Sequence, residues 1–358
     1  MEAVTLVGQK LAELTKTLCS IPSETGEEKQ IADWVEGRCR LSAPPASVHR
    51  IGNSVVCDPA SEMSGVPTVA LVGHLDTVRC AEQQPLEIRD GRVYGCGASD
   101  MKAGVATMLA LLEQREALIS ARPLWIFYDK EEGAHAENGL EPVLQSGILP
   151  AIDLAIVLEP TDMSLQMGCM GTMHATVTVA GQRAHSARPW QGDNAIFRMI
   201  PLLQRFEKLQ RREVAFGELI YYEVSVPTQI STANSKNVVP DRVEVNVNVR
   251  FAPGNTVADA EHELRELVGD LGEVKVFDRA PAGEVYLDHP LIEPWRLREQ
   301  IPVQTKQAWT DVARFTERGI AAVNFGPGET AQAHQSGEWC SVQSLEFAHA
   351  RLRAFFAS

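Results

Sequence analysis

The chain has 358 residues, which is enough for two domains at about 100 to 200 residues each. Hydrophobic residues make up 44% of the chain and charged residues 22%, a composition that excludes disordered, collagen-like and coiled-coil proteins. The formal net charge is -14, and no run of lysines and arginines occurs that would neutralise phosphates. We therefore expect no nucleic-acid partner.

The amino terminus and the cysteines predict the compartment. Residues 1–18 are acidic and polar where a secretory signal needs a basic segment followed by an apolar one, and no apolar run reaches the roughly 18 residues that span a bilayer. We therefore expect a cytoplasmic protein with no membrane partner. The seven cysteines are scattered, odd in number and without a CxxC pair, so we expect reduced thiols and neither a disulfide framework nor a thiolate zinc site.

The first 170 residues predict helices packed on a mostly parallel sheet. Helical spacing of apolar residues predicts a helix over about residues 3–19. Apolar runs at 66–72, 124–128 and 152–158 predict strands, and a helix over 105–112 lies between the first two. Because ligands of such sheets bind at the carboxyl ends of the strands, the residues that follow each run are candidates for a functional site.

Residues 171–283 have a different pattern. Alternating apolar and polar residues predict antiparallel strands, and two helical patterns lie between them. From about Leu291 the sequence returns to an α/β pattern. We therefore expect an α/β protein in which a larger mixed-sheet domain, residues 1–170 and 284–358, is interrupted by an inserted α+β domain, residues 171–283.

Two polar segments precede the helix over 105–112. His74 follows the first strand and has Asp76 two residues on, a pattern typical of a metal ligand whose neighbouring carboxylate fixes its tautomer, although a hydrogen-bonded loop histidine gives the same pattern. Asp100 lies in a glycine-rich segment just before the helix, where it is either an N-cap or a carboxylate that bridges metal ions. Neither segment is decisive alone.

Further carboxylates and a histidine follow the later strands. Glu131 and Glu132 follow the strand 124–128, and because their side chains diverge, one can bind a cation while the other faces a water molecule. Taken alone, this segment is more typical of a solvated acidic loop. Glu159 ends the strand 152–158, and His334 lies in a turn-rich loop after AAVNF. Two histidines and three carboxylates suit a pair of zinc ions about 3.5 to 4 Å apart, and the set is His74, Asp100, Glu132, Glu159 and His334. Glu131 then remains to accept a proton from water.

The motifs together resemble those of a known family. GHLDTV, GCGASDMKAG, DKEEG, LEPT, RAHSARPWQGDNA, NVVPD and the late FGPG…AH loop are similar to those of the di-zinc metallopeptidases and deacylases of family M20, over essentially the whole chain. Within the family, RAHSARPWQGDNAI, NVVPD with NVNVRFAP, and AWTDVARFTERGIAAVNFGPG most resemble the actinobacterial type of succinyl-diaminopimelate desuccinylase. The resemblance implies a catalytic domain with an inserted lid and dimerisation domain.

The resemblance also implies two zinc sites that share one carboxylate. His74, Asp100 and Glu159 would bind one ion. Asp100, Glu132 and His334 would bind the other, so that Asp100 is the bridge. Ligand sets of oxygen and nitrogen accept several divalent ions, so Co²⁺ or Mn²⁺ also suits one site.

Roles for residues outside the ligand set follow from the same resemblance. Asp76 would support His74, and Glu131 would act as general base and then as general acid. The family often has a cis peptide bond after the bridging aspartate, here Asp100. In a homodimer formed through the lid domain, His185 would enter the partner's site and stabilise the oxyanion, and Asn237 would lie at the same junction.

The implied reaction is hydrolysis of N-succinyl-L,L-2,6-diaminopimelate to succinate and L,L-diaminopimelate by a hydroxide held between the zinc ions, in lysine and peptidoglycan precursor synthesis. This substrate carries several carboxylates, so a chain of net charge -14 must present local cations to bind it. Arg188 and Arg250 are the best candidates, and Arg183 and Arg314 are weaker ones, although solvated surface arginines would look the same. Thr310 and Asp311, in the AWTDVARF turn, are expected to contact either the backbone or the amino acid end of the substrate.

Other activities fit the same motifs. Acetylornithine deacetylases, aminoacylases and dipeptidases of the same family use the same metal ligands on other acyl groups, and only the arginines and the AWTDVARF turn separate them. A non-catalytic zinc-binding scaffold is a further alternative. Glu131 argues against the scaffold, because a protein that only binds metal needs no base.

Overall fold

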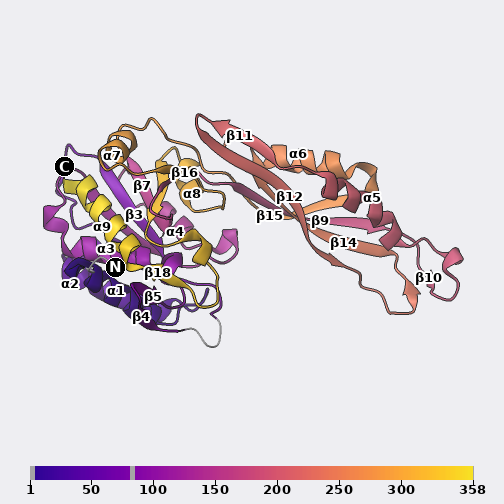
Figure 1. The fold of residues 1–358 in the computed structure, drawn as a ribbon, viewed down its shortest axis with the longest axis horizontal. Coiled ribbons are helices and arrows are strands. Elements are labelled where there is room, and N and C mark those ends of the chain that lie inside the picture. The colour runs from indigo at the N-terminus through magenta and orange to yellow at the C-terminus, as the bar shows by residue number, and fades with distance from the viewer. Residues whose placement is uncertain (1–4, 81–84, 358) are drawn as a thin grey trace. The chain divides into compact units, whose positions relative to one another are not determined.

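The computed structural model describes residues 5–80 and 85–357, and it divides into two compact units (Figure 1). Met1–Gly168, Val285–Gln304 and Arg314–Ser358 form the first unit. Cys169–Glu284 and Thr305–Ala313 form the second. Within the described ranges, every helix is too short or too polar to cross a membrane.

The first unit is built on an eight-stranded mixed sheet. In spatial order its strands are β1 (Val48–Ile51), β2 (Ser54–Cys57), β6 (Arg122–Tyr128), β3 (Thr68–His74), β7 (Leu154–Pro160), β17 (Ala321–Gly326), β8 (Leu165–Met167) and β16 (Val303–Thr305). β6, β3, β7 and β17 are parallel, whereas β2 and β8 join them in the antiparallel sense. Every residue of β3, β7 and β17 is buried, as expected for parallel strands covered on both faces.

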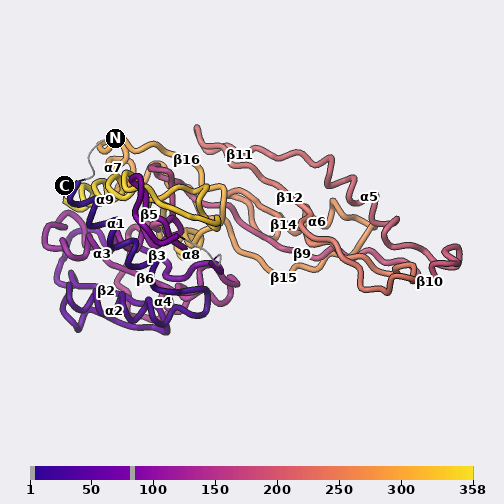
Figure 2. Tube along the Cα trace, turned by 60° about the horizontal axis from the view of Figure 1, so that its bottom comes forward, coloured from indigo at the N-terminus to yellow at the C-terminus, as the bar shows by residue number. Residues whose placement is uncertain are grey.

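Helices flank the strands of this unit (Figure 2). They are α1 (Leu6–Cys19), α2 (Lys29–Ser42), α3 (Ala103–Glu113), α4 (Leu140–Gln145), α7 (Ile292–Arg298) and α9 (Val342–Ala357). A further helix, α8 (Val312–Thr316), begins in the second unit and ends in the first. α3 contacts β3, β6 and β7, and α1 and α9 pack against α3. All residues of α3 except Glu113 are buried, because this apolar helix is enclosed between the sheet and the other helices.

A small three-stranded sheet links the carboxyl-terminal part of the first unit to the segment that precedes α3. Its strands are β4 (Glu87–Arg89), β5 (Arg92–Tyr94) and β18 (Trp339–Ser341). β5 is the central strand and pairs antiparallel with both neighbours. The loops that follow β5 and precede β18 are therefore brought together.

The second unit has a five-stranded antiparallel sheet with two helices packed on one face (Figure 1). The strands, in spatial order, are β11 (Arg212–Phe216), β12 (Leu219–Ser231), β14 (Arg242–Phe251), β9 (Gly171–Ala180) and β15 (Glu273–Ala280), and the helices are α5 (Ala195–Lys208) and α6 (Val257–Val268). The burial of alternate residues in β9 and β14 gives the sheet one apolar face, which forms the core with the helices. β10 (Ala184–His185) and β13 (Val238–Val239) pair separately.

The predicted class, α/β with a larger mixed-sheet domain and a part of α+β character, is confirmed, with one difference in detail. The large sheet is mixed because short outer strands pair with the parallel strands in the antiparallel sense. β11 was not predicted, because this edge strand has no buried residue and so no apolar alternation. The predicted helix over residues 3–19 corresponds to α1, and residues 3 and 4 lie outside the described residues.

Candidate metal centre

The predicted metal-binding residues lie at the carboxyl ends of neighbouring strands of the first unit. His74 is the last residue of β3, Glu131 and Glu132 follow β6, and Glu159 is the penultimate residue of β7. β3 pairs in parallel with both β6 and β7, so these three strand ends meet at one edge of the sheet. His334 lies in the loop after β17, which is the next parallel neighbour of β7.

One group of potential ligands consists of His74, Asp100 and Glu159, whose ligand atoms all lie within 4.8 Å of one another. His74 is 1% exposed. Its Nε2 lies 3.2 Å from Oδ1 of Asp100 and 4.0 Å from Oε1 of Glu159. Its Nδ1 lies 3.0 Å from the backbone oxygen of Asp76. A carbonyl oxygen only accepts hydrogen bonds, so Nδ1 carries a proton and Nε2 is the atom that can bind a metal ion.

A second group consists of Asp100, Glu132 and His334. Nε2 of His334 lies 2.9 Å from Oε1 of Glu132 and 3.5 Å from Oδ2 of Asp100. The two oxygens of Asp100 therefore face two different histidines, with Oδ1 toward His74 and Oδ2 toward His334. This is the arrangement that a carboxylate bridging two metal ions requires. The peptide bond between Asp100 and Met101 is cis.

The carboxylates of the centre raise the pKa of both histidines. Hydrogen bonds to Asp100 and Glu132 raise the pKa of His334 to about 10, although partial burial opposes them. Burial opposes the charge of His74, but hydrogen bonds to Asp100 and Asp76 outweigh it and raise the pKa well above its ordinary value. The carboxylates therefore make this site favourable for positive charge. Two imidazoles and three carboxylates are a donor set that fits two divalent cations.

Glu131 lies close to the same ligand atoms. It forms a third group with His74 and Glu132, again with all ligand atoms within 4.8 Å. The backbone N–H groups of Glu131 and Glu132 donate to Oδ1 and Oδ2 of Asp76, over 2.9 and 3.0 Å. Burial opposes the charge of Asp76, yet the hydrogen bond and charge of His74 and these N–H groups keep its pKa below the ordinary value. Asp76 thus joins His74 to the turn that carries both glutamates.

Two residues of the centre were not identified from the sequence. Thr25 donates from Oγ1 to Oδ2 of Asp76 over 3.0 Å. Glu338 accepts hydrogen bonds from three backbone N–H groups in residues 97–100, and its burial raises its pKa to about 7 against the effect of these donors. Neither residue has a distinctive pattern, because both lie in polar loops where such side chains are usually solvated.

The predicted oxyanion-stabilising residue lies in the second unit. His185 is exposed on β10, and its Nδ1 accepts the backbone N–H of Ala187 over 3.0 Å. The backbone oxygen of Asn237 accepts the N–H of Ser186 over 2.9 Å, so Asn237 is held beside His185. Arg188 follows in the same loop and its side chain is exposed.

The remaining predicted substrate contacts of the second unit differ in exposure. Arg250, on β14, is half-buried, its Nε donates to Oδ1 of Asn248 over 3.1 Å, and burial lowers the pKa of its guanidinium. Thr310 is buried, and its backbone oxygen accepts the N–H of Ala313. Arg183 is exposed.

Arg314, the weaker candidate that lies in the first unit, is held within the protein. It is 3% exposed. Its guanidinium donates to Oε2 of Glu141 over 3.1 Å and to the backbone oxygen of His135. These contacts attach α8 to α4 and, through His135, to the loop that follows the glutamate pair.

The prediction that all cysteines are reduced is wrong for one pair, because Cys80 and Cys96 form a disulfide. Their Cα atoms are 5.8 Å apart, within the range that a disulfide spans, although 16 positions separate them in sequence. One follows the segment with Asp76 and the other precedes Asp100, so the fold that brings these two segments together also brings the cysteines together. Sequence spacing alone does not show this proximity. The five other cysteines are free, and all but Cys19 are buried.

Comparison with known proteins finds relatives of this chain in both sequence and fold. Residues 70–358 match the family model described as Peptidase family M20/M25/M40. The chain is 36% identical over 351 residues to a putative succinyl-diaminopimelate desuccinylase of Mycobacterium tuberculosis, with 96% of this chain and 97% of the relative covered. It is 37% identical over 357 residues to the succinyl-diaminopimelate desuccinylase of Corynebacterium glutamicum, with 96% and 95% covered. Among solved structures, the YXEP protein of Bacillus subtilis, a dinuclear metal-binding M20 peptidase, has a TM-score of 0.70 at 18% identity, and 98% of each chain is covered.

Proposed function

Because the chain belongs to peptidase family M20/M25/M40, we propose that it is a succinyl-diaminopimelate desuccinylase, which hydrolyses N-succinyl-L,L-2,6-diaminopimelate to succinate and L,L-diaminopimelate. The observation that carries a hydrolytic role is the pair of ligand groups that share Asp100. The choice of a succinyl substrate rests on the likeness to two desuccinylases over nearly the whole chain. The reaction belongs to the synthesis of lysine and peptidoglycan precursors, and we place it in the cytoplasm.

The shared carboxylate divides the ligands between two metal ions. His74 and Glu159 would hold one ion, Glu132 and His334 would hold the other, and Asp100 would contact both. Zinc suits this mixture of imidazole and carboxylate donors, and the same donors accept Co²⁺ or Mn²⁺. Bound there, the two ions would polarise the amide carbonyl and lower the pKa of the attacking water.

Glu131 is the residue that transfers the proton. Its carboxylate lies beside the ligand atoms of His74 and Glu132, and its backbone is fixed by Asp76. Glu131 accepts a proton from water as the new C–O bond forms at the acyl carbon. It then gives this proton to the amide nitrogen as the C–N bond breaks, so that the amine leaves as a neutral group and the acyl carbon becomes a carboxylic acid, whose remaining proton then passes to the amine or to solvent.

His185 of a second copy of the chain would stabilise the negative oxygen that develops on the acyl group. Because Nδ1 of His185 accepts the N–H of Ala187, the neutral ring carries its proton on Nε2. Nε2–H is then a donor for the developing oxyanion. A single donor of this kind contributes about 2.7 to 4 kcal/mol to catalysis.

Arginines of the second unit would bind the carboxylates of the substrate. Arg250 is half-buried, and a guanidinium stays charged when partly desolvated and binds a carboxylate more strongly there. Arg188 and Asn237 lie beside His185, at the part of the second unit that would meet the reacting amide. Thr310 would contact the amino acid end of the substrate.

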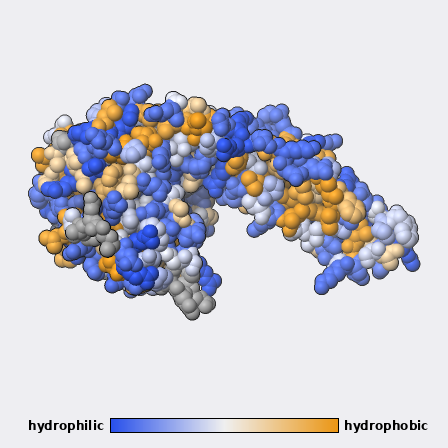
Figure 3. Space-filling view, in the orientation of Figure 1, coloured by the Kyte–Doolittle hydropathy of each residue, from blue (hydrophilic) through white to orange (hydrophobic). Residues whose placement is uncertain are grey.

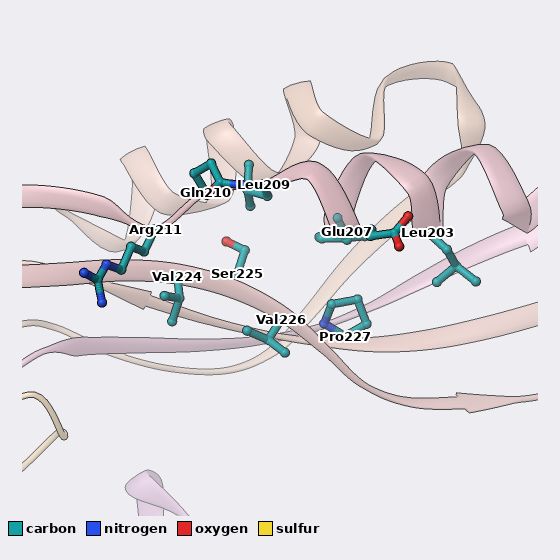
Figure 4. A pocket seen from close by; sticks show the side chains of 10 residues that line it. Leu203, Glu207, Leu209, Gln210, Arg211, Val224, Ser225, Val226 and Pro227 are labelled. Carbon is teal, nitrogen blue, oxygen red and sulfur yellow. The ribbon is translucent and has the colours of Figure 1, made fainter.

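We infer further that the chain forms a homodimer through its second unit. β12 pairs with β11 only as far as Glu223, so on that side its remaining residues, up to Ser231, are an open edge among the described strands. α5 and β12 line a groove beside this edge (Figure 4). Apolar side chains gather on the second unit (Figure 3), and Phe197, Val226 and Ile230 are 68%, 48% and 58% exposed. An open apolar edge favours association, and a second copy supplies a matching edge.

Sedimentation equilibrium tests the homodimer. We expect a dimer for the unmodified chain and a shift toward monomer for Ile230→Lys. The matched control is Ile119→Lys, because Ile119 is 66% exposed in the first unit and should leave the dimer intact. A monomeric unmodified chain, or equal effects of the two lysines, would contradict the proposed interface.

The proposed reaction is tested by release of free amine from N-succinyl-L,L-diaminopimelate, with N-acetylornithine, N-acyl amino acids and dipeptides as comparison substrates. We expect selectivity for the succinyl substrate and a fall in turnover of about 10²- to 10⁴-fold in Glu131→Gln, with metal content unchanged. Glu137→Gln is the control, because Glu137 is exposed in the loop six positions on. Preference for another acyl group would assign a different substrate to the same centre, and hydrolysis of none would contradict the enzyme proposal.

A further inference from the structure

Glu338 is a buried carboxylate that the proposed reaction does not use. It is 3% exposed. Its Oε2 accepts the backbone N–H of Gly97 over 2.7 Å. Its Oε1 accepts those of Ser99 and Asp100 over 2.7 and 2.8 Å. One side chain therefore satisfies three backbone donors of the loop 97–100, and one of these donors belongs to the bridging residue itself.

The small sheet explains why Glu338 reaches this loop. β18 begins at Trp339, which lies opposite Tyr94, the last residue of β5. The pairing continues one step further, because the N–H of Gly95 donates to the backbone oxygen of Glu338 over 3.1 Å. The Glu338 carboxylate then extends over the residues that follow β5. The loop turns tightly there, since a Cβ on Gly97, whose φ is +75°, would lie 2.5 Å from the Thr77 side chain.

We propose that Glu338 is a positioning residue that fixes the backbone of the loop 97–100, so that Asp100 presents one oxygen to each metal site. This inference rests on the proposed binding of two metal ions. The Asp100 side chain has only two rotatable bonds, so the directions of its oxygens depend on where its backbone is held. Its N–H is held by Glu338, and its oxygens face His74 and His334. Without Glu338, three N–H groups would lack this acceptor and the loop would move toward other partners.

The loop 97–100 is also hydrogen-bonded to the segment that carries His334, a proposed ligand of the second metal ion. Oγ of Ser99 donates to the backbone oxygen of Glu329 over 3.0 Å and accepts the N–H of Glu329 over 2.9 Å. The segment 329–338, which carries His334, is therefore bonded to the loop 97–100 near both of its ends. Loss of Glu338 would disturb both Asp100 and the segment with His334. Metal binding should then weaken at both sites, whereas loss of His334 alone should weaken one.

The test is zinc binding to metal-free protein, measured by competition with a chromophoric chelator, together with urea unfolding of the same metal-free samples. We expect Glu338→Gln, which keeps one oxygen acceptor, to weaken zinc binding at both sites by at least tenfold, and Glu338→Ala to weaken it more. His334→Ala should weaken one site only. Glu329→Gln is the matched control, because the Glu329 carboxylate accepts from Ser341 and not from the loop 97–100, and it should stay within about twofold of the unmodified protein.

The outcomes separate this inference from the proposed function. If the unmodified chain binds two zinc ions and Glu338→Gln binds both with unchanged affinity, the positioning role is refuted and the function stands. A lower urea midpoint with unchanged zinc affinity refutes it also, because that is the signature of a purely structural carboxylate. Weakening of a single site in Glu338→Gln contradicts the role of the shared Asp100. An unmodified chain that binds no zinc overturns the proposed function, and with it this inference.

Discussion

The substitution Asp76→Asn is expected to destabilise the first unit and to displace the turn that carries the glutamate pair. The Asp76 carboxylate is fully buried, and its two oxygens accept the N–H groups of Glu131 and Glu132 separately. Asparagine has one side-chain oxygen, so in either orientation of its amide one of these N–H groups faces an NH₂ group. A buried N–H without an acceptor costs about 1 to 3 kcal/mol. The free energy of unfolding of the metal-free protein should fall by this amount.

Turnover should fall as well as the free energy of unfolding. Displacement of Glu131 by about 1 Å from the reacting atoms is enough to lower turnover by about 100-fold. The unfolding free energy is measured in urea by tryptophan fluorescence, and Trp125, which is fully buried on β6 in the same unit, reports on this region. Turnover is measured with zinc at saturation, so that weaker metal binding does not add to the effect.

A matched substitution tests whether the effect of Asp76→Asn comes from the two backbone N–H donors. Thr25→Val removes one hydrogen bond to the same carboxylate, from Oγ1 to Oδ2, and leaves both backbone N–H groups with their acceptors. Its expected cost is about 0.5 to 1.5 kcal/mol, with a small effect on turnover. Equal losses of stability and turnover in Thr25→Val and Asp76→Asn would refute the reasoning from the backbone donors. An unchanged unfolding free energy in Asp76→Asn would refute the cost assigned to the buried N–H.

Three further predictions concern the stability of the first unit. Burial lowers the pKa of His349 to about 4, so the unfolded state binds a proton at higher pH than the folded state does, and stability is lost as the pH falls. Urea titrations should show the unfolding free energy falling by up to about 3 kcal/mol between pH 6.5 and 4, and an equally steep fall in His349→Gln would assign the effect to other groups. The Cys80–Cys96 disulfide closes a loop with a sequence separation of 16. Its reduction should lower the unfolding free energy by about 3 kcal/mol. Equal urea midpoints with and without a dithiol reductant would contradict this. Gly104→Ala should cost about 1 to 3 kcal/mol, because a Cβ there would lie 2.4 Å from a backbone oxygen of β7. Gly37→Ala should be stabilising, because a Cβ at Gly37 of α2 would have nothing within 4 Å. A similar loss of stability in Gly104→Ala and Gly37→Ala would mean that the contact with β7 does not cause the loss in Gly104→Ala.

The parts of the fold that could be predicted from the sequence are those with a local signal. β3 and β7 are continuous apolar runs because both faces of these strands are covered, and His74 and Glu159 stand out because each is a polar residue at the end of such a run. The alternation in β9 and β14 was equally clear, because one face of that sheet is buried against helices. In each case a few consecutive residues contain the information.

Features formed by contacts between distant segments could not be predicted in this way. β11 has no buried residue, so only its pairing with β12 defines it as a strand. Cys80 and Cys96 lie in separate loops that the fold of the first unit brings together. Glu338 lies more than 230 positions from the loop that it holds, and its neighbours in sequence do not differ from those of a solvated glutamate.

The backbone of the proposed metal ligands is held in two different ways. His74 pairs with Tyr128 of β6, and Glu159 lies between Val157 and Pro160, which pair with β17, so the sheet holds the backbone around both residues. Asp100 and Glu132 lie in loops, where no such ladder exists. Each of these loops is instead held by a buried carboxylate that is not in the proposed ligand set: Glu338 accepts the N–H of Asp100, and Asp76 accepts the N–H of Glu132. A carboxylate suits this task because it accepts several N–H groups at once, and because its charge strengthens each bond. Loop-borne ligands should therefore depend on these two acceptors, whereas the strand-borne ligands should tolerate changes around them.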